Sequence, residues 1–437
     1  MSQIEDIYDI FCEHPTVVTD SRAIVPGCIF FALKGANFDG NLFASQALEQ
    51  GAALAVVDDP SQARDHKYIV VEDALKTLQQ LAAYHRQTMG IPIIGITGTN
   101  GKTTTKELVA EVLSTQYNIL YTHGNLNNHI GVPLTLLRLT QEHQLAIVEM
   151  GASKPGDIKE LVDIARPDYG LITNVGMAHL QGFGSLEGVK KTKGELYDFL
   201  RQNSGIAFLN EDDCTLKRML EGIPHIAYGT KGNELVVGSM IEVKDNPFLS
   251  FSWHTAMEPH NEYVVKTGLV GGYNLPNALA AVVIGCYFNV SADNINRALE
   301  TYAPSNNRSQ LIRTEHNILI ADAYNANPTS MTAAVDNFES LQTDKPKVLI
   351  LGDMNELGTE SSHAHTEMLK HIKEKGVWKE VCLCGPCFSK IGEHDGIKIF
   401  ADVQELGDYL KSNPIEGSAI LVKGSNGIHL ERILPLC

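Results

Sequence analysis

The stretch G-I-T-G-T-N-G-K-T-T-T, residues 95–105, ends an apolar run that begins at Ile91. An apolar strand that passes through a glycine-rich loop into a helix forms a phosphate cradle, because loop N–H groups point inward and the positive helix end faces the anion. In such a cradle Lys102 is placed to reach the outer phosphates and the Thr103 hydroxyl to ligate Mg²⁺. The pattern predicts a nucleoside triphosphate site, with a helix running from Thr103 to about residue 115.

This loop is a variant of the Walker pattern, since Ile96 stands where the strict pattern has a glycine. Its glycines are Gly95, Gly98 and Gly101. The alternative is an ordinary glycine-rich turn between a strand and a helix. The G-K-T-T sequence behind a buried strand favours the phosphate loop over that turn.

Composition narrows the class of protein. The chain has 437 residues, of which 43% are hydrophobic and 20% charged, which is typical of a globular protein of two to four domains. A net charge of −17 argues against nucleic acid or an anionic membrane as a partner. The acidic N-terminus lacks the features of a signal peptide, and the apolar stretch 278–288 is too short to cross a bilayer. We therefore expect a cytoplasmic protein.

The order of apolar runs and helical periods predicts three α/β domains. Residues 1–86 form a small mixed α/β N-terminal domain. Residues 87–310 alternate apolar strands with helices, which predicts a doubly wound parallel sheet carrying the phosphate loop, with added β structure at 235–270. Residues 311–437 repeat this alternation as a Rossmann-like C-terminal domain. Strands of the central sheet are predicted at 92–97, 119–122, 146–150, 169–173 and 206–209.

Cys382, Cys384 and Cys387 form a C-L-C-G-P-C cluster near the end of the chain. A zinc site would need a fourth ligand and usually has paired C-x-x-C knuckles. The run 380–385 is also typical of a buried strand that ends in a turn. Small buried thiols are therefore favoured over metal ligands.

Further polar residues lie at or near the predicted strand ends and helix starts, where α/β folds of this kind bind their ligands. Glu149 ends an apolar strand, where a carboxylate suits Mg²⁺ but is also common as a solvated rim residue. His179 follows the strand end T-N-V-G-M-A and could be a metal ligand or a satisfied polar residue. Lys193 lies on the next helix, where a lysine is usually solvated. Asn274 could cap a helix or read a base edge, and Asp322 could bind a ribose or belong to a turn.

The combination and order of these motifs are more specific than any one of them. They are T-G-T-N-G-K-T-T, N-L-N-N from Asn125, E-M-G at Glu149, N-V-G-M-A-H ending at His179, K-G-E-L-Y from Lys193, Arg308, and D-A-Y-N-A-N-P from Asp322. Over nearly the whole chain they resemble the Mur ligases. T-D-S-R at 19–22, F-D-G-N-L-F at 38–43, L-G-D-M-N-E-L-G from Leu351 and the D-A-Y-N-A-N-P run are most similar to the member that adds D-alanyl-D-alanine. One departure is Tyr273, where many relatives have histidine.

The resemblance implies ATP and two Mg²⁺ ions as cofactors. It assigns ATP to the loop residues Gly98, Thr99, Asn100, Gly101, Lys102, Thr103 and Thr104. It places Thr103 and Glu149 at one ion, and His179 with a carbamylated Lys193 at the second. It also implies that Asn274 contacts adenine, Asp322 the ribose and Arg308 the γ-phosphate. Tyr324 and Asn325 are implied as further ATP-binding residues. Catalysis is thereby implied for Lys102, Glu149, His179, Lys193 and Arg308.

The implied reaction joins D-alanyl-D-alanine to UDP-N-acetylmuramoyl-tripeptide through an acyl phosphate, in cytoplasmic peptidoglycan precursor synthesis. Asp20, Ser21 and Arg22 would lie near the UDP group, and Asn127 and Asn128 near the muramoyl-tripeptide. A monomer is expected. Two alternatives stay open: another ligase of the superfamily, such as folylpolyglutamate synthase, and a P-loop phosphotransferase or NTP-driven switch protein.

Overall fold

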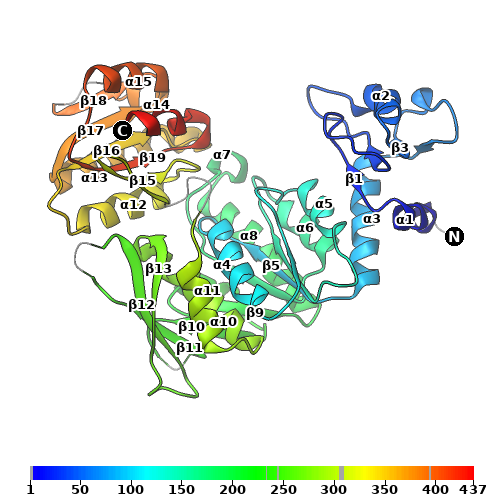
Figure 1. Ribbon diagram of the computed structural model, residues 1–437, viewed down its shortest axis with the longest axis horizontal. Helices are drawn as coiled ribbons and strands as arrows, with labels where there is room; N and C mark the ends of the chain where they lie inside the picture. Colours follow the sequence, from blue (N-terminus) through cyan, green and yellow to red (C-terminus); the bar gives the residue numbers. More distant parts are fainter. Residues whose placement is uncertain (1–2, 233, 244–245, 305–309, 393–394) are drawn as a thin grey trace.

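The computed structural model describes residues 3–232, 234–243, 246–304, 310–392 and 395–437. Three sheets follow one another along the chain and lie in three lobes (Figure 1). The chain is mixed α/β, and parallel pairing dominates each sheet. In the described part of the chain no helix is both long and apolar enough to cross a membrane.

The N-terminal lobe is a four-stranded parallel sheet in the order β1-β2-β3-β4. Apolar residues of the short strands are buried, with Ile29 and Phe31 inaccessible to solvent. Helix α1, which the sequence analysis did not predict, buries Ile7 and Phe11 against this lobe. The elements are α1 (Gln3–Glu13), β1 (Val17–Val18), β2 (Ile29–Phe31), η1 (Gly40–Phe43), α2 (Ala44–Glu49), β3 (Leu54–Val57), η2 (Pro60–Gln62), β4 (Tyr68–Val70) and α3 (Ala74–Met89).

The central lobe holds a nine-stranded sheet in the order β13-β12-β11-β10-β9-β8-β5-β7-β6. Seven strands, β5 to β11, run parallel, and all five residues of both β5 and β7 are buried, as expected of strands covered on both faces. The β structure expected at 235–270 consists of β11, which is parallel to β10, and of β12 and β13, which add an antiparallel edge to the sheet. The strands are β5 (Ile93–Thr97), β6 (Ile119–Tyr121), β7 (Leu145–Glu149), β8 (Tyr169–Ile172), β9 (Ile206–Asn210), β10 (His225–Gly229), β11 (Val236–Met240), β12 (Phe248–Thr255) and β13 (Tyr263–Val270).

Helices cover the parallel part of the sheet, and α10 lies against α4, the helix that follows the phosphate loop (Figure 1). Because α10 packs between α4 and the strands, it is apolar on nearly every side, with Ala278 to Gly285 all buried. The helices are α4 (Lys102–Ser114), α5 (Gly131–Leu136), α6 (Asp157–Ala165), α7 (Leu180–Phe183), α8 (Leu186–Gln202), α9 (Cys214–Met219), η3 (Gly272–Asn274), α10 (Leu275–Tyr287) and α11 (Ala292–Thr301).

The C-terminal lobe is a six-stranded sheet in the order β14-β15-β19-β16-β17-β18, in which only β14 is antiparallel to its neighbour. Its elements are β14 (Gln310–Arg313), β15 (Ile318–Asp322), α12 (Pro328–Ser340), β16 (Lys347–Gly352), η4 (Gly358–Glu360), α13 (Ser361–Lys375), β17 (Trp378–Cys384), α14 (Pro386–Ser389), β18 (Ile397–Phe400), α15 (Val403–Ser412), β19 (Ala419–Lys423), η5 (Asn426–Ile428) and η6 (Leu430–Leu436).

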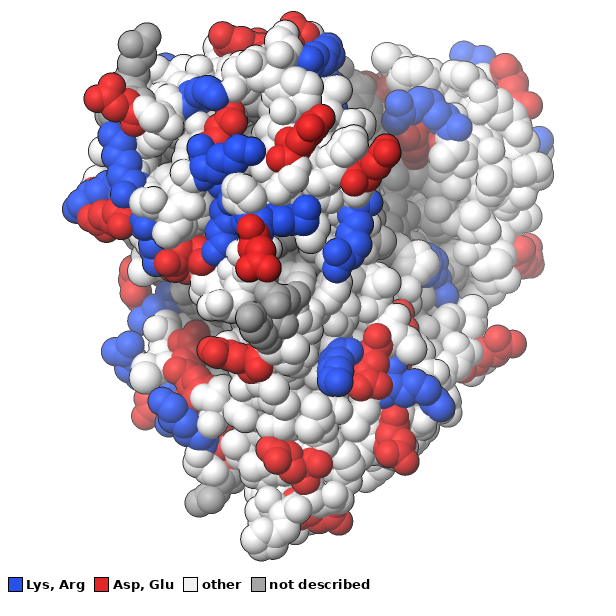
Figure 2. Space-filling view, turned by 60° about the vertical axis from the view of Figure 1, so that its left-hand side comes forward, with Lys and Arg blue, Asp and Glu red and all other residues white. Residues whose placement is uncertain are grey.

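Two junctions hold the lobes together. Helix α3 packs on α5 and α6, where the buried Arg86 bonds the carbonyl oxygens of Ala165 and Arg166 and pairs with Asp168 at 2.9 Å. On the other side, the Gly272 N–H donates to Asn337 Oδ1 at 3.1 Å, which joins the central lobe to α12. Figure 2 shows acidic and basic side chains interspersed over one face, with a hollow between the lobe at the right and the rest.

Candidate active site

A cavity of about 1130 Å³ lies where the carboxyl ends of the central strands face the C-terminal lobe. Its wall combines the loop after β5, the end of β7, the loop after β8 and the loops after β15, β16 and β19. Ligands gather at this edge in open α/β sheets. The predicted site residues that line it are Thr99, Asn100, Gly101, Lys102, Thr103, Thr104, Asn127, Asn128, Glu149, His179, Asn274, Asp322, Tyr324 and Asn325.

The loop between β5 and α4 requires glycine at two positions. Gly98 has φ +143°, and a Cβ there would lie 2.0 Å from Thr173 Oγ1. Gly101 has φ +79°, and a Cβ there would lie 2.6 Å from Asn277 Oδ1. Both the backbone conformation and the close approach of neighbouring side chains therefore exclude other residues without rearrangement. The helix begins at Lys102, one residue before the predicted start.

The segment after β8 braces this loop, which explains its polar sequence. Asn174 Oδ1 accepts the Asn100 N–H at 3.0 Å, and its Nδ2 donates to the Asn100 carbonyl oxygen at 3.0 Å. Thr173 Oγ1 donates to the same oxygen at 2.6 Å. The Lys102 ammonium bends back over the loop and donates to the carbonyl oxygens of Gly98 and Thr99, at 2.8 and 3.1 Å. Lys102 thus lies at the place where the sequence predicts the phosphates.

Glu149 is a buried carboxylate with an unsatisfied oxygen. Its Oε1 accepts from Thr103 Oγ1 at 3.3 Å and from Asn127 Nδ2 at 2.8 Å. The side chain is 1% exposed, and Oε2 has no hydrogen-bond partner in the described part of the chain. A buried carboxylate oxygen without a donor is costly unless a cation or water completes it. The oxygen donors of Glu149 and Thr103 fit Mg²⁺.

His179 stands at the start of α7 in a left-handed conformation, with φ +52°. Its Nδ1 lies against the carboxylate of Glu356, which comes from the C-terminal lobe. Burial lowers the pKa of the imidazole, and the negative charge of Glu356 opposes that shift. The ring is therefore mainly neutral near pH 7, which is the form that can offer a nitrogen to a metal ion.

Lys193 is buried on α8 and is 2% exposed, which excludes the solvated-lysine interpretation. Burial, and next the positive charge of Lys102, hold the pKa of its amine well below the usual value. The Nζ lies 5.8 Å from the centroid of the Phe183 ring. Lys193 does not line the cavity itself, although the charges of Lys102 and Glu149 act on it.

Asn274 and Asp322 are both engaged within the protein. Asn274 Nδ2 donates to the Val270 carbonyl oxygen, and its Oδ1 accepts from Asn277 Nδ2, both at 2.9 Å. Asp322 ends β15 and accepts from Lys423 Nζ at 2.6 Å, at the end of the neighbouring strand β19. Both residues border the cavity, so a nucleotide would meet side chains that are already ordered.

Several predicted residues lie elsewhere. Arg308 falls in 305–309, outside the described residues. Asp20, Ser21 and Arg22 form a turn after β1, away from the cavity wall, where Arg22 pairs with Asp20 at 2.7 Å and lowers the pKa of that carboxyl to about 2. Asn128 Oδ1 accepts the N–H groups of Ile130 and Gly131, so it holds the turn that leads into α5 and also lines the cavity.

Three residues that the sequence analysis gave no role prove to shape the site. Lys423 is 3% exposed at its side chain and holds Asp322. Asn327 bonds the phosphate loop, and Glu356 contacts His179. Asn327 and Glu356 stood inside quoted motifs. The available signal for Lys423 was a lysine that ends the apolar run A-I-L-V-K.

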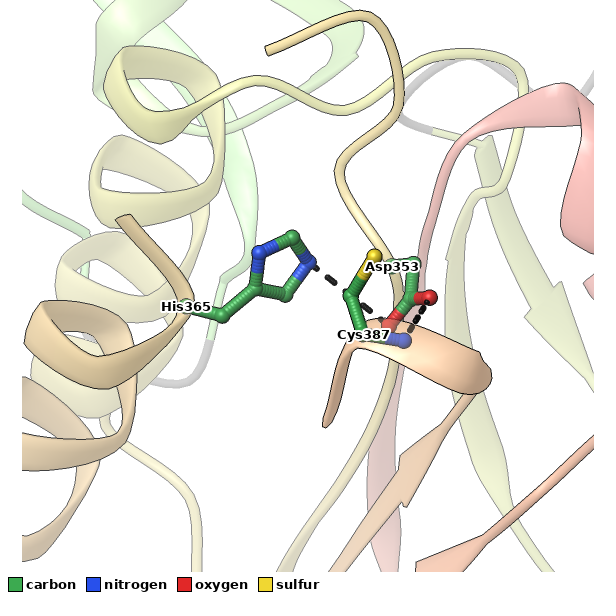
Figure 3. A group of neighbouring side chains, drawn as sticks. All are labelled: Asp353, His365 and Cys387. Atoms are coloured by element: carbon green, nitrogen blue, oxygen red, sulfur yellow. Dashed lines mark hydrogen bonds and ion pairs between the residues drawn. The ribbon is translucent and has the colours of Figure 1, made fainter. Parts of the chain in front are cut away.

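The cysteine cluster is distributed over two environments. Cys382 and Cys384 lie in strand β17 with no exposure, and burial raises the pKa of both thiols, to about 12 for Cys384. Cys387 instead lies beside Asp353 and His365, with donor atoms within 4.8 Å of one another (Figure 3).

The Asp353–His365–Cys387 cluster is held by backbone groups. The carboxylate oxygens of Asp353 accept the N–H groups of Cys387 and Phe388, at 2.7 and 3.0 Å, at the start of α14. His365 Nε2 accepts the Met354 N–H at 3.0 Å, and its Nδ1 faces the Ser361 carbonyl oxygen at 2.7 Å. Both imidazole nitrogens of His365 therefore already have hydrogen-bond partners and are not available to a metal ion. The cluster instead fixes the loop after β16.

Comparison with known proteins agrees with this architecture. Residues 16–93 match the profile of the Mur ligase family, catalytic domain; residues 96–285 match the Mur ligase middle domain; and residues 307–426 match the Mur ligase, glutamate ligase domain. The chain is 36% identical to UDP-N-acetylmuramoyl-tripeptide--D-alanyl-D-alanine ligase of Escherichia coli, over 96% of this chain and 92% of that one. The chain belongs to the Mur ligase family.

Solved Mur ligase structures have the same three-lobed fold. MurF from Acinetobacter baumannii superposes with a TM-score of 0.85 at 32% identity, covering 96% of this chain and 92% of that one. MurF from Thermotoga maritima, solved in complex with ADP, superposes with a TM-score of 0.86 at 26% identity, covering 100% and 98%. A folylpolyglutamate synthase from Thermotoga maritima, at 13% identity and a TM-score of 0.60 over 83% and 93%, shares the fold alone.

Proposed function

We propose that this Mur ligase joins D-alanyl-D-alanine to UDP-N-acetylmuramoyl-tripeptide with consumption of ATP, forming an amide bond in peptidoglycan precursor synthesis. One observation carries the proposal: a phosphate loop and an unsatisfied carboxylate, Glu149, face a second lobe across a cavity of about 1130 Å³. The identity of 36% to the Escherichia coli ligase supports the choice of substrates.

The phosphate loop binds the triphosphate of ATP in this proposal. The N–H groups of residues 98–104 and the positive end of α4 face the phosphates, and Lys102 swings from the loop carbonyls to the β- and γ-phosphates. Adenine lies beside Asn274 and the ribose beside Asp322, Tyr324 and Asn325, which line the cavity. Arg308 is proposed for the γ-phosphate on the family resemblance.

Two groups of residues are proposed to hold divalent cations. Thr103 and Glu149 would hold one Mg²⁺, and the orphaned Oε2 of Glu149 supports this. His179 and Lys193 would hold a second, once Lys193 is carbamylated. Burial of Lys193 favours the neutral amine, which is the form that adds CO₂, and the resulting carbamate supplies anionic oxygens. Bound there, the ions neutralise charge that gathers on the transferring phosphoryl group.

The reaction has two steps. The carboxylate of the tripeptide attacks the γ-phosphorus, ADP leaves, and an acyl phosphate forms. The amine of D-alanyl-D-alanine then attacks the acyl carbon, phosphate leaves, and the amine loses its proton. Lys102 and the loop N–H groups stabilise the charge of the first step by their position.

The C-terminal lobe completes the reaction chamber. Because water would hydrolyse an acyl phosphate, closure of this lobe over the phosphate loop protects the intermediate. The UDP-facing residues are proposed as Asp20, Ser21 and Arg22, and the residues near the muramoyl-tripeptide as Asn127 and Asn128. A cytoplasmic location and a monomeric state stay predictions.

A coupled assay tests the function. ADP release is followed with UDP-N-acetylmuramoyl-tripeptide and D-alanyl-D-alanine together, and the product is identified by its mass. We expect sustained ADP release and a pentapeptide product only when both substrates are present, because without the dipeptide the reaction stops at the acyl phosphate. Replacing them by a folate and glutamate tests the folylpolyglutamate synthase alternative. ADP release that continues without any amide product would instead support a phosphotransferase or switch protein.

A further inference from the structure

The geometry points to Glu356 as a positioning residue: we propose that it orients His179 for metal binding and thereby couples docking of the C-terminal lobe to assembly of the metal site. This inference rests on the proposed function in one respect, the metal role of His179. Glu356 belongs to the L-G-D-M-N-E-L-G segment, for which the reaction described above has no other use.

The first observation is a contact between lobes. Glu356 Oε2 pairs with His179 Nδ1, and the Glu356 carbonyl oxygen accepts the Gln181 N–H at 3.1 Å. The two residues come from the loop after β16 and from the start of α7, and both line the cavity. A carboxylate on one ring nitrogen fixes the tautomer and the ring orientation, and it makes the other nitrogen a better metal ligand.

The second observation is backbone conformation. His179 and Glu356, with φ of +52° and +63°, are two of the six described non-glycine residues in the left-handed region that L-residues avoid. These two residues touch each other across the lobe junction. Unfavourable conformations that meet at a cavity are typical of sites whose surroundings impose a required geometry.

The third observation is the rigidity of the Glu356 loop. Met354 and Asn355 donate their N–H groups to His365 Nε2 and Ser425 Oγ, at 3.0 and 2.9 Å. Asp353 is itself fixed at the start of α14 (Figure 3). The Asp353–His365–Cys387 cluster thus holds the backbone just before Glu356. A loop held so firmly can aim a carboxylate precisely at a residue of another lobe.

A Mn²⁺ titration of the whole chain, followed by electron paramagnetic resonance in the presence of a non-hydrolysable ATP analogue, tests the inference without turnover. We expect Glu356→Ala to weaken the second Mn²⁺ site by about 10- to 100-fold. Glu356→Gln should recover part of that loss, because its amide oxygen can still accept the Nδ1 proton. Glu360→Gln, at an exposed glutamate in the neighbouring η4, is the matched control and should bind Mn²⁺ like the parent chain.

His179→Ala separates the inference from the proposed function. If His179→Ala weakens the second site and Glu356→Ala does not, the positioning role is wrong and the metal role of His179 stands. If neither variant changes Mn²⁺ affinity, both are wrong. Tighter Mn²⁺ binding by Glu356→Ala would also overturn the inference, since Glu356 would then compete with the metal. Equal melting temperatures of the variants show that the fold is retained.

Discussion

Asn100 in the phosphate loop and Asn327 at the start of α12 exchange hydrogen bonds across 227 residues of chain. Asn327 Nδ2 donates to Asn100 Oδ1 at 2.7 Å, and Asn100 Nδ2 lies 3.4 Å from Asn327 Oδ1. The same Asn327 oxygen caps α12 by accepting the Ser330 N–H at 2.9 Å. One side chain thus ties the nucleotide loop to the first turn of a helix in the C-terminal lobe.

Asn327→Ser should weaken this tie while keeping the helix cap. Serine caps helices about as well as asparagine, but its short side chain does not reach Asn100. Losing a hydrogen bond worth about 1 kcal/mol predicts a roughly fivefold lower kcat/KM for ATP. Steady-state kinetics and thermal unfolding check this. An unchanged kcat/KM at an unchanged melting temperature would show that the bond does not contribute to turnover.

Lys102→Ala should abolish amide formation and leave the fold intact. The ammonium is the cation of the phosphate loop, so its loss removes stabilisation of the transferring phosphoryl group and should lower kcat by ~100-fold or more. Lys191→Ala, an exposed lysine on α8, is the control. Activity of Lys102→Ala within a few fold of the parent, in a folded protein, would refute the phosphate-loop assignment.

The phosphate loop and the sheet around it could be predicted because their signals are local. Glycine spacing, a buried apolar run and a helical period all occur within a few residues, so β5 and α4 lie within one residue of their predicted bounds at the loop. The alternation of strands and helices likewise predicted the α/β class. Helix α1 was not predicted, because acidic residues are interspersed with its apolar ones and obscure the helical spacing of the buried Ile7 and Phe11.

Contacts between lobes could not be predicted from the sequence. The Glu356–His179 and Asn327–Asn100 pairs join residues far apart in the chain, and nothing in either segment indicates its partner. The burial of Lys193 is a second feature that the sequence alone does not show. Spacing alone suggested a solvated lysine, while the family resemblance suggested a metal ligand, and only the packing of α8 shows that the side chain is buried.

Glu149→Gln should remove the stabilisation that Mg²⁺ gives the protein. Ligand at 100 times its Kd stabilises a protein by about 2.7 kcal/mol, so Mg²⁺ with an ATP analogue should raise the melting temperature of the parent by a few degrees. The variant should show a much smaller rise, because a neutral amide replaces the orphaned carboxylate oxygen. Glu187→Gln, exposed on α8, should behave like the parent. Equal rises in all three proteins would exclude Glu149 as a ligand.

Lys193→Met should inactivate the enzyme and yet stabilise it in CO₂-free buffer at pH 7. Replacing a buried ionisable group by an apolar one of similar length is expected to gain ~1 kcal/mol or more. The pKa of Lys193 in the folded protein is lowered well below the usual 10.5. Between the lowered folded pKa and 10.5, the unfolded chain therefore binds more protons than the folded one, and the stability of the parent rises with pH in that range. The advantage of the variant in urea unfolding should therefore shrink from pH 7 to pH 9. A constant advantage would contradict the lowered pKa.

The acyl phosphate should form without D-alanyl-D-alanine. The phosphate loop, Glu149 and His179 all belong to the central lobe, and the residues proposed for the UDP group belong to the N-terminal lobe, so both substrates of the first step bind before the dipeptide is needed. Borohydride reduction of the enzyme with ATP and UDP-N-acetylmuramoyl-tripeptide alone should convert the activated carboxyl into an alcohol, detected by mass. Lys102→Ala, which lacks the cation for phosphoryl transfer, should yield no alcohol. If the parent also yields none while complete turnover is fast, the first step requires the dipeptide, and the order proposed for this reaction is wrong.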